Sequence, residues 1–307
     1  MKIKVTANAF SKNSILRNEL LQYFPNSEFN NTGRRFTGDE LVSFLSDADG
    51  AIIGLEKITD QLLIQLPNLK IIAKYGVGLD NIDQIACKKN NVNVGWTGGV
   101  NKLSVAEMTL GFMLDLSRNL QLTSNQLKKG LWNKSGGRQL TAQTIGIIGL
   151  GHIGKELVRL LKPFNCTILC HDIIKQNEYC TKENVQSVSL KELLNKSDIV
   201  SIHTPLTSVT NGLVNNTFLS SMKKDSYLIN TARGPIVVLE DLKKALTNDV
   251  ILGAAIDVYD VEPPKDKKLL LLQNLICTPH TGGNSSEAVV LMGQSAIKHL
   301  NLFFNKN

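Results

Sequence analysis

Short apolar runs alternate with helix-like stretches along almost the whole chain. Runs rich in β-branched residues occupy positions 2–7, 50–54, 70–76, 91–96, 144–149, 166–171, 198–203, 226–232, 251–258 and 275–279. The later runs are apolar at nearly every position, as expected of strands buried on both faces of a parallel sheet. Strands that alternate with amphipathic helices predict an α/β architecture in which helices cover parallel sheets.

Two Gly-Gly pairs divide this pattern. Gly98-Gly99 precedes a long helical stretch, and Gly282-Gly283 follows the last apolar run. Each pair is followed by Asn or Ser and then by helix-like sequence, which indicates a hinge and a helix cap. At 307 residues the chain is long enough for two domains. We therefore expect one discontinuous domain of residues 1–99 plus 282–307, a second domain of residues 100–281, and a cleft between them.

The composition is that of an ordinary globular protein, with 42% hydrophobic and 20% charged residues. No window approaches the roughly 18 consecutive apolar residues that cross a bilayer, and the N-terminus alternates like a strand rather than a signal peptide. We expect a cytoplasmic protein that does not enter the membrane. The five cysteines are scattered and form no CxxC pair, so we expect neither a disulfide framework nor a metal site.

The formal net charge of +7 raises the question of nucleic-acid binding. The lysines are spread along the chain without a dense basic run or interleaved aromatic residues, so we expect no nucleic-acid partner. Two interpretations of the charge stay open. It is either a solvated surface or a means of attracting an anionic substrate and a dinucleotide.

A glycine-rich segment follows the apolar run at 144–149. Gly149, Gly151 and Gly154 have the spacing GxGxxG, with a strand pattern before them and a helical pattern after them. Gly149 permits a tight turn, Gly151 lets the backbone approach a diphosphate, and Gly154 lets the helix pack closely on its strand. The helix N-terminus offers unpaired N–H groups to an anion. The segment predicts a dinucleotide site.

Asp172, which directly follows the apolar run at 166–171, indicates which dinucleotide binds. Asp172 lies 18 residues after Gly154, near the expected distance for a carboxylate that accepts the ribose hydroxyls. Its charge repels a 2′-phosphate, and Ile173 and Ile174 provide no arginine to reverse that choice, so NAD is favoured over NADP. The alternative is a glycine-rich turn of another α/β protein, with Asp172 as an ordinary surface residue.

Three chemically capable residues follow three of the later runs. Arg233, Glu262 and His280 each stand in a loop after a predicted strand, where open α/β sheets bind their ligands. Arginine can hold a carboxylate through two parallel hydrogen bonds, and imidazole can donate and accept a proton near neutral pH. A neighbouring carboxylate stabilises the imidazolium. Taken singly, these residues suit a surface salt bridge, a loop carboxylate and a helix cap. Together they indicate the reduction of a 2-oxo acid.

Several segments in the same order resemble the D-isomer-specific 2-hydroxyacid dehydrogenases, the family of D-3-phosphoglycerate dehydrogenase, glyoxylate/hydroxypyruvate reductase and D-lactate dehydrogenase. They are residues 74–83, Asn101 with 104–107, the glycine loop, residues 230–234, 252–258, Glu262-Pro263 and 278–280. The resemblance covers nearly the whole chain. It implies two doubly wound parallel-sheet domains, a Rossmann NAD-binding domain at 100–281 and a flavodoxin-like substrate domain. It also implies hydride transfer between NAD and C2 of a small D-2-hydroxy or 2-oxo acid.

The resemblance also implies individual roles. Arg233 binds substrate, Glu262 partners His280, and His280 is the acid/base; Arg233 and His280 also line the coenzyme. The backbone of Val77 and Gly78 cradles the substrate carboxylate. The other cofactor contacts implied are His152 and Ile153 at the diphosphate, Thr204 and Pro205 at the adenosine, Ala232 with Arg233 at the nicotinamide, Asp257 at the carboxamide, and Thr231 and Gly282 without a specified part of the coenzyme.

The resemblance leaves the substrate open. Formate dehydrogenases of this fold carry Gln at the acid, so Glu262 argues for a hydroxy acid. Phosphoglycerate dehydrogenases usually place an arginine after the third strand, where Gly54 falls here, although Arg34, Arg35, Lys57 or Lys74 could supply the charge. D-3-phosphoglycerate/3-phosphohydroxypyruvate and glyoxylate/hydroxypyruvate both stay open. The alternative function is a non-enzymatic, NAD-responsive, corepressor-like protein. Relatives pair through the nucleotide-binding domain, so a homodimer is expected.

Overall fold

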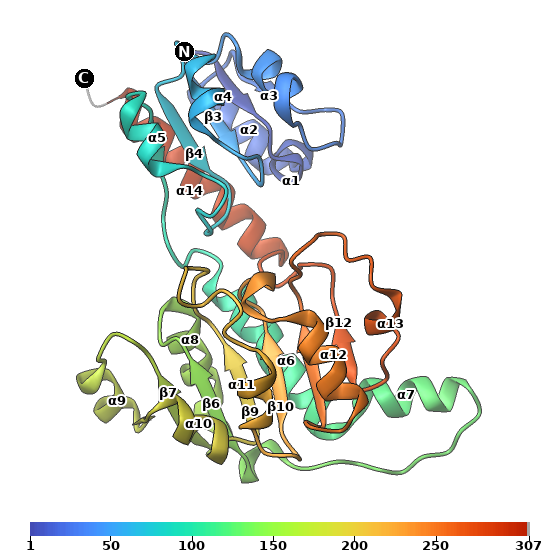
Figure 1. Cartoon of the computed structure of the whole chain (residues 1–307). Coiled ribbons are helices and arrows are strands. Elements are labelled where there is room, and N and C mark those ends of the chain that lie inside the picture. Colours follow the sequence, from blue (N-terminus) through green and yellow to red (C-terminus); the bar gives the residue numbers. More distant parts are fainter. Residues whose placement is uncertain (306–307) are drawn as a thin grey trace. The chain divides into compact units, whose positions relative to one another are not determined.

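The computed structural model describes residues 1–305, and these divide into two compact units. The first contains residues 1–101 together with the described residues from 283 onward, and the second contains residues 102–282. Each unit is built on its own parallel sheet, of five and of seven strands (Figure 1). The expectation of two doubly wound parallel-sheet domains is confirmed.

The sheet of the first unit has the strand order β2-β1-β3-β4-β5, and every neighbouring pair is parallel. Its strands are β1 (Ile3–Val5), β2 (Glu28–Phe29), β3 (Gly50–Ile53), β4 (Ile71–Lys74) and β5 (Asn93–Gly95). This is the order of a flavodoxin-like sheet. β2 has no counterpart among the predicted runs, because a two-residue edge strand with one exposed glutamate leaves no hydrophobic pattern.

Helices cover both faces of this sheet. They are α1 (Asn8–Lys12), α2 (Ser14–Tyr23), α3 (Gly38–Leu45), α4 (Asp60–Ile64), α5 (Gln84–Lys89) and α14 (Ser286–Phe304). One core cluster joins the strands to α1, α2 and α14, and another joins them to α3, α4 and α5. α14 packs closely on α2, because a Cβ on Gly293 would lie 2.3 Å from Leu16 Cδ1. The last helix therefore completes the core of the first unit.

The sheet of the second unit has the order β12-β11-β10-β9-β6-β7-β8, again all parallel. Its strands are β6 (Thr144–Ile148), β7 (Thr167–His171), β8 (Gln186–Ser187), β9 (Ile199–Ile202), β10 (Tyr227–Asn230), β11 (Gly253–Ile256) and β12 (Leu275–Cys277). The order reverses between β6 and β9, which is the switch point where Rossmann sheets bind ligands. β8, an exposed polar edge strand, is also absent from the predicted runs.

The second unit carries a core on each face of its sheet. Its helices are α6 (Lys102–Arg118), α7 (Leu120–Lys128), α8 (His152–Leu161), α9 (Asn177–Glu183), α10 (Leu190–Lys196), α11 (Asn216–Ser220), α12 (Leu239–Thr247) and α13 (Lys267–Leu270). α6 and α8 pack on one face, and α10, α11 and α12 pack on the other. Short 3-10 turns lie at Leu140–Ala142, Lys162–Phe164 and Gly234–Ile236. The connecting loops lie at the carboxyl ends of the central strands.

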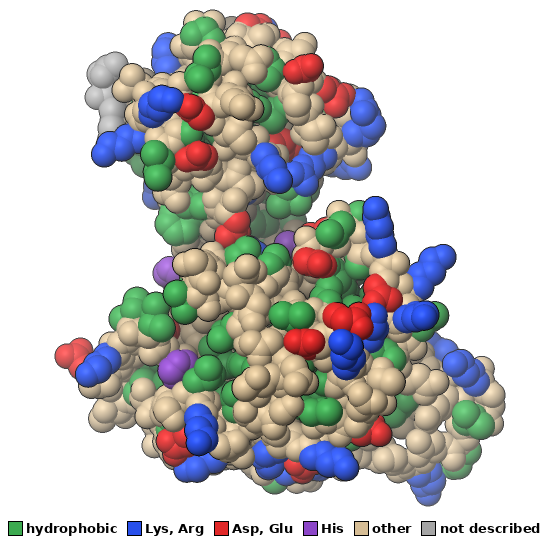
Figure 2. All heavy atoms as spheres, in the orientation of Figure 1, with side chains coloured by type: hydrophobic (Ala, Val, Ile, Leu, Met, Phe, Trp, Pro, Cys, Tyr) green, Lys and Arg blue, Asp and Glu red, His purple; other side chains and the backbone are tan. Residues whose placement is uncertain are grey.

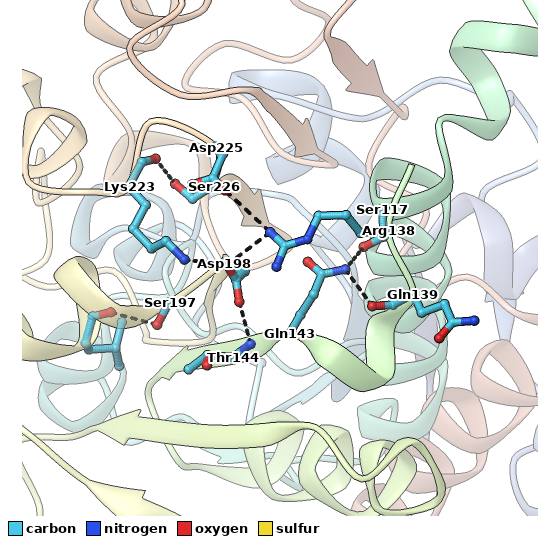
Figure 3. A network of polar contacts seen from close by, with 11 residues as sticks. Ser117, Arg138, Gln139, Gln143, Thr144, Ser197, Asp198, Lys223, Asp225 and Ser226 are labelled. Atoms are coloured by element: carbon cyan, nitrogen blue, oxygen red, sulfur yellow. Dashed lines mark hydrogen bonds and ion pairs between the residues drawn. The ribbon is translucent and has the colours of Figure 1, made fainter. Parts of the chain in front are cut away.

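The amino end of the seven-stranded sheet is closed by a charged network (Figure 3). The carboxylate of Asp198, just before β9, accepts hydrogen bonds from the Thr144 N–H at 2.7 Å, Lys223 Nζ at 2.6 Å and Arg138 Nη1 at 3.2 Å. Burial alone would raise the pKa of Asp198, but the bonds from Lys223 and Thr144 hold that pKa below its usual value. The network ties β6 and the loop before β10 to Arg138.

On the face that Figure 2 shows, charge is dispersed rather than gathered. On the face shown in Figure 2, lysine and arginine side chains lie among aspartates, glutamates and uncharged groups. Many of them form exposed ion pairs, such as Arg34 with Glu40 at 2.6 Å and Lys89 with Asp60 at 2.6 Å. Such pairs contribute little to stability. No helix within residues 1–305 has the length and apolar character needed to cross a membrane.

Candidate active site

The glycine-rich loop joins β6 to α8, and its three glycines differ in their steric surroundings. Gly149 has φ +94°, and a Cβ there would lie 2.7 Å from the carbonyl oxygen of His203. A Cβ on Gly154 would lie 2.3 Å from the carbonyl oxygen of Gly149. A Cβ on Gly151, the N-cap of the ten-residue helix α8, would meet no atom within 4 Å. Gly149 and Gly154 therefore serve the fold, and Gly151 borders open space at a helix N-terminus.

Asp172 stands directly after β7, beside this loop. Its Oδ2 accepts a hydrogen bond from the N–H of Leu150 at 2.6 Å, and its Oδ1 accepts one from the N–H of Ile174 at 2.8 Å. Asp172 therefore binds the backbone of the glycine-rich loop at Leu150 as well as lying beside it. Since a carboxylate oxygen has more than one acceptor site, these bonds leave capacity for ribose hydroxyls.

The end of β9 adds buried polar atoms to the same region. His203 Nε2 lies 2.8 Å from Ser201 Oγ, and burial lowers the pKa of His203 to about 4. The Nδ1 of His203 and the Oγ1 of Thr204 are buried and have no hydrogen-bond partner within residues 1–305. The methyl group of Thr204 would meet a Cβ on Gly149 at 2.9 Å, so these unpartnered atoms adjoin the glycine-rich loop. Buried polar groups without partners are uncommon and are often satisfied by a ligand. Pro205 follows them.

The loop after β10 holds Thr231, Ala232 and Arg233, and the side chain of Asn230 shapes it. Asn230 Oδ1 accepts from the N–H of Ala232 at 3.0 Å, and its Nδ2 donates to the carbonyl oxygen of Arg233 at 2.9 Å. Arg233 Nη1 donates to the carbonyl oxygen of Ala232 at 2.7 Å. Thr231 Oγ1 lies 3.1 Å from Thr109 Oγ1 on α6. The backbone that carries Arg233 is thus fixed from inside the unit.

The arginine loop packs directly against the loop that carries the acid. A Cβ on Gly234 would lie 1.9 Å from the carbonyl carbon of Tyr259, so only glycine permits this approach. The Tyr259 N–H donates to Glu262 Oε1 at 3.1 Å, and the Tyr259 hydroxyl donates to the carbonyl oxygen of Thr278 at 3.0 Å. Tyr259 therefore links the acid's loop to the loop that carries His280.

Glu262 and His280 form a direct pair across these loops. His280 Nδ1 lies 2.9 Å from Glu262 Oε1 and 2.8 Å from Oε2, and the two side chains are 39% and 33% exposed. His280 has φ +56°, a left-handed conformation that is uncommon for a residue other than glycine. Pairing through Nδ1 directs the opposite nitrogen, Nε2, away from the carboxylate. The expected contact between the acid and the histidine is present.

Asp257 is buried beneath the histidine loop. Its Oδ1 accepts hydrogen bonds from Thr278 Oγ1 at 2.6 Å and the Thr281 N–H at 2.8 Å, and its Oδ2 accepts one from the Gly282 N–H at 2.8 Å. A Cβ on Gly282 would lie 2.9 Å from Oδ2. Asp257 therefore orders the segment on both sides of His280. Sequence reasoning proposed a coenzyme contact for it and missed this anchoring of the loop.

Val77 and Gly78 lie in the first unit, in the half-buried loop after β4. The carbonyl oxygen of Val77 accepts a hydrogen bond from Trp96 Nε1 at 2.8 Å. Lys74, at the end of β4, is buried and donates to Asn81 Oδ1 at 2.7 Å and to the carbonyl oxygen of Gly54. This loop is therefore held by side chains from the segments beside it.

Three residues that shape these loops escaped the sequence reasoning, namely Asn230, Tyr259 and Trp96. Asn230 was detectable in principle, because a polar residue that ends an apolar run and precedes Thr-Ala-Arg-Gly suits an Asx-type turn. The other two act through contacts between segments distant in sequence, which no local pattern reveals. Within residues 1–305 no group of three His, Cys, Asp or Glu side chains is placed to hold a metal ion.

Comparison with known proteins agrees with this geometry. The family described as "D-isomer specific 2-hydroxyacid dehydrogenase, NAD binding domain" matches residues 110–282. The hydroxypyruvate reductase of Thermotoga maritima is 34% identical over 94% of this chain and 95% of its own length. The glyoxylate reductase of Thermofilum pendens is 39% identical over 85% of this chain and 80% of its own.

A solved structure gives the same result for the fold. The NAD-dependent formate dehydrogenase from Staphylococcus aureus, in complex with NAD, is 32% identical, with a TM-score of 0.85 over 100% of this chain and 96% of its own. The fold and the paired loops thus define an NAD-dependent oxidoreductase that acts on CH–OH groups. The chain belongs to the D-isomer-specific 2-hydroxyacid dehydrogenase family. The relatives are named as enzymes, so a corepressor-like function is not favoured.

The residues present fit NAD as the cofactor. Gly151 borders open space at the N-terminus of α8, a position that suits an anion such as a diphosphate, and the carboxylate of Asp172 beside it disfavours a 2′-phosphate. The buried Thr204 Oγ1 and His203 Nδ1 remain available to a bound group.

Proposed function

We propose that the protein reduces a small, unphosphorylated 2-oxo acid, such as glyoxylate or hydroxypyruvate, to the 2-hydroxy acid, which has the D configuration where C2 becomes chiral. The observation that carries this proposal is the Glu262–His280 pair, joined by Tyr259 and Gly234 to the loop of Arg233 at the carboxyl end of the sheet. The Thermotoga and Thermofilum relatives, named as hydroxypyruvate and glyoxylate reductases, support the substrate class.

The roles of the three side chains follow from the charges that develop. NADH, when bound, supplies the hydride to C2, and negative charge then grows on the carbonyl oxygen. His280 donates a proton from Nε2 to that oxygen, and Glu262, bound to Nδ1, stabilises the imidazolium and fixes the ring. Arg233 binds the substrate's carboxylate and carbonyl oxygens. The same groups serve the oxidation with the proton moving the other way.

Backbone groups of each unit also have roles in this proposal. The N–H groups of Val77 and Gly78 bind the substrate carboxylate, and those of His152 and Ile153 bind the diphosphate. Asp172 binds the adenosine ribose. Further coenzyme contacts are proposed for Thr204, Pro205, Thr231, Ala232, Asp257 and Gly282.

The charges near the end of β3 favour an unphosphorylated substrate. Gly54 follows the strand directly, where a phosphate-binding arginine would be needed. Lys74 is buried in contacts with Asn81 and the backbone of Gly54, and Arg34 is paired with Glu40. Two of the four cations that could replace the arginine are therefore engaged within the unit.

The test is a panel of substrates, in which each reaction is monitored by the loss of coenzyme absorbance. Glyoxylate, hydroxypyruvate, pyruvate and 3-phosphohydroxypyruvate are compared by kcat/KM, each with NADH and with NADPH. The proposal expects the highest kcat/KM with glyoxylate or hydroxypyruvate and NADH. A preference for 3-phosphohydroxypyruvate contradicts the unphosphorylated class, and no turnover with any of the four contradicts the reaction.

We also propose a cytoplasmic homodimer. α7 buries none of its residues within the chain, and Leu120, Leu127 and Leu131 are each more than half exposed. Exposed apolar side chains on one segment are typical of a surface that a partner covers.

The five cysteines are thiols, which suits a reducing compartment. Light scattering coupled to gel filtration tests the dimer, and a monomeric mass contradicts it.

A further inference from the structure

The peptide group between Val77 and Gly78 is held by one aromatic side chain. Trp96 Nε1 donates to the carbonyl oxygen of Val77 at 2.8 Å. The C=O and N–H of a trans peptide point in opposite directions in one plane. The indole that fixes the carbonyl of Val77 therefore also fixes the direction of the Gly78 N–H, which points away from Trp96.

The N–H groups of this loop are available to a ligand. Within the described chain, the backbone N–H groups of Val77 and Gly78 donate to no other residue. Both residues are half-buried, so solvent reaches them less freely than it reaches an open loop. Unused donors at a strand's carboxyl end form an anion-binding concavity when they are aimed at one point.

Trp96 itself is fixed by residues on both sides. It follows β5 directly, and β5 pairs with β4, the strand that leads into the Val77 loop. A Cβ on Gly95 would lie 2.5 Å from His299 Cβ on α14, and Thr97 Oγ1 lies 2.8 Å from His299 Nε2. The backbone around Trp96 therefore has little freedom, although its ring is 40% exposed.

Tryptophan suits this position chemically because its indole N–H donates and cannot accept. A side chain that could reverse its role, such as an amide, would permit the peptide to turn over. Lys74 and Asn81 hold the other side of the loop through the backbone of Gly54. Among these hydrogen bonds, the one from Trp96 is made to the Val77–Gly78 peptide itself.

We propose that Trp96 is a positioning residue, which sets the affinity for the substrate carboxylate by orienting the Val77–Gly78 peptide. This inference rests on the proposed function, because it assumes that the carboxylate of a 2-oxo acid binds there. Trp96 touches neither substrate nor coenzyme in this role. Its loss should therefore weaken substrate binding equally before and during hydride transfer, which raises KM and leaves kcat unchanged.

The test uses Trp96→Phe in the full-length protein, which keeps an aromatic ring and removes the donor. The matched control is Tyr23→Phe, which removes the polar group of an exposed aromatic residue on α2 of the same unit. We expect KM for hydroxypyruvate to rise roughly three- to tenfold in Trp96→Phe, the effect of one lost hydrogen bond. The values of kcat, the Kd of NADH and the melting temperature should stay at wild-type values, as should every value for Tyr23→Phe.

Binding of oxamate, an unreactive analogue of a 2-oxo acid, gives a second readout. Its inhibition constant should rise in Trp96→Phe by the same factor as KM. An active wild type with unchanged KM and oxamate inhibition in Trp96→Phe overturns the role of Trp96 and leaves the proposed function standing. Equal losses in kcat, NADH affinity and melting temperature also overturn it, because they indicate a general structural role. No turnover by either protein removes the proposed function and this inference with it.

Discussion

The two ends of the seven-stranded sheet both carry charged residues, but they use them differently. At the amino end, the carboxylate of Asp198 is 6% exposed and is enclosed by Arg138, Lys223 and the backbone of Thr144 (Figure 3). At the carboxyl end, His280 and Glu262 are paired with each other yet remain 39% and 33% exposed. Charges enclosed by protein partners have no access to a ligand, whereas charges that are ordered but accessible can act on one.

The uncharged groups differ less clearly between the two ends. The carboxyl end contains the unpartnered buried atoms of His203 and Thr204 and the open space above Gly151. At the amino end, Gln143 Nε2 donates to Ser117 Oγ at 2.9 Å while Gln143 Oε1 is buried without a hydrogen-bond partner within residues 1–305, and Ser197 Oγ donates to the carbonyl oxygen of Leu193 at 2.7 Å. We infer that substitutions at the two ends separate activity from stability, and the following substitutions test that separation.

The largest effect on activity is expected from His280→Ala. Without the imidazole no group protonates the carbonyl oxygen, so kcat with hydroxypyruvate should fall roughly a hundredfold or more. The Kd of NADH, measured by fluorescence titration, and the melting temperature should stay near wild-type values. Turnover within a few-fold of wild type would remove His280 from the mechanism.

The opposite result is expected from Asp198→Asn. The amide leaves the partly exposed cations of Lys223 and Arg138 beside an uncharged group, and the loss of both ion pairs should cost about 1–2 kcal/mol. Urea unfolding should show that loss, while KM and kcat measured below the transition stay unchanged. The control is Asp225→Asn, whose carboxylate is 62% exposed and lies 3.5 Å from Arg138, and whose effect should be close to zero. Equal effects of both changes would refute the distinction.

Two glycines of one loop sharpen the comparison further. Gly151→Ala meets no atom and has an ordinary φ of −83°, so the fold should be unaffected while NADH affinity falls about tenfold, because a methyl group enters the diphosphate space. Gly154→Ala places its Cβ 2.3 Å from a carbonyl oxygen, so its main effect should be a lower melting temperature. Unchanged NADH affinity in Gly151→Ala would place the diphosphate elsewhere.

The smallest effect concerns His203 and pH. Burial lowers its pKa from 6.5 to about 4, so the unfolded chain binds more protons than the folded chain between these values. The folded state therefore loses stability as the pH falls through that window, and His203→Gln should reduce the loss by roughly 4 °C in melting temperature between about pH 7 and about pH 5. Parallel melting curves for variant and wild type would contradict the assignment.

Much of the fold was predictable because buried parallel strands are apolar throughout. The runs at 144–149 and 198–203 contain β6 and β9, and the glycine spacing marked the turn between β6 and α8. The edge strands β2 and β8 were not predicted, since two-residue strands are defined by their neighbours rather than by their own sequence.

The chemistry of the candidate site was predictable, but the contacts that hold its loops in place were not. The order of Arg233, Glu262 and His280 after strands indicated that their loops would share one edge of the sheet. The link that Tyr259 makes between two loops, and the anchoring of the His280 segment by Asp257, depend on contacts between residues about 20 positions apart. The left-handed backbone of His280 likewise depends on its surroundings, because histidine has no strong preference for it.

A crystal structure of the wild-type protein with NADH and oxamate tests the central claim most directly. The account predicts that the amide carbonyl oxygen of oxamate, which takes the place of the substrate's 2-oxo oxygen, lies within about 3 Å of His280 Nε2 and within hydrogen-bond reach of Arg233, with Nδ1 still bound to Glu262. Oxamate bound away from Arg233 and His280, with the coenzyme in place beside Gly151, would contradict it.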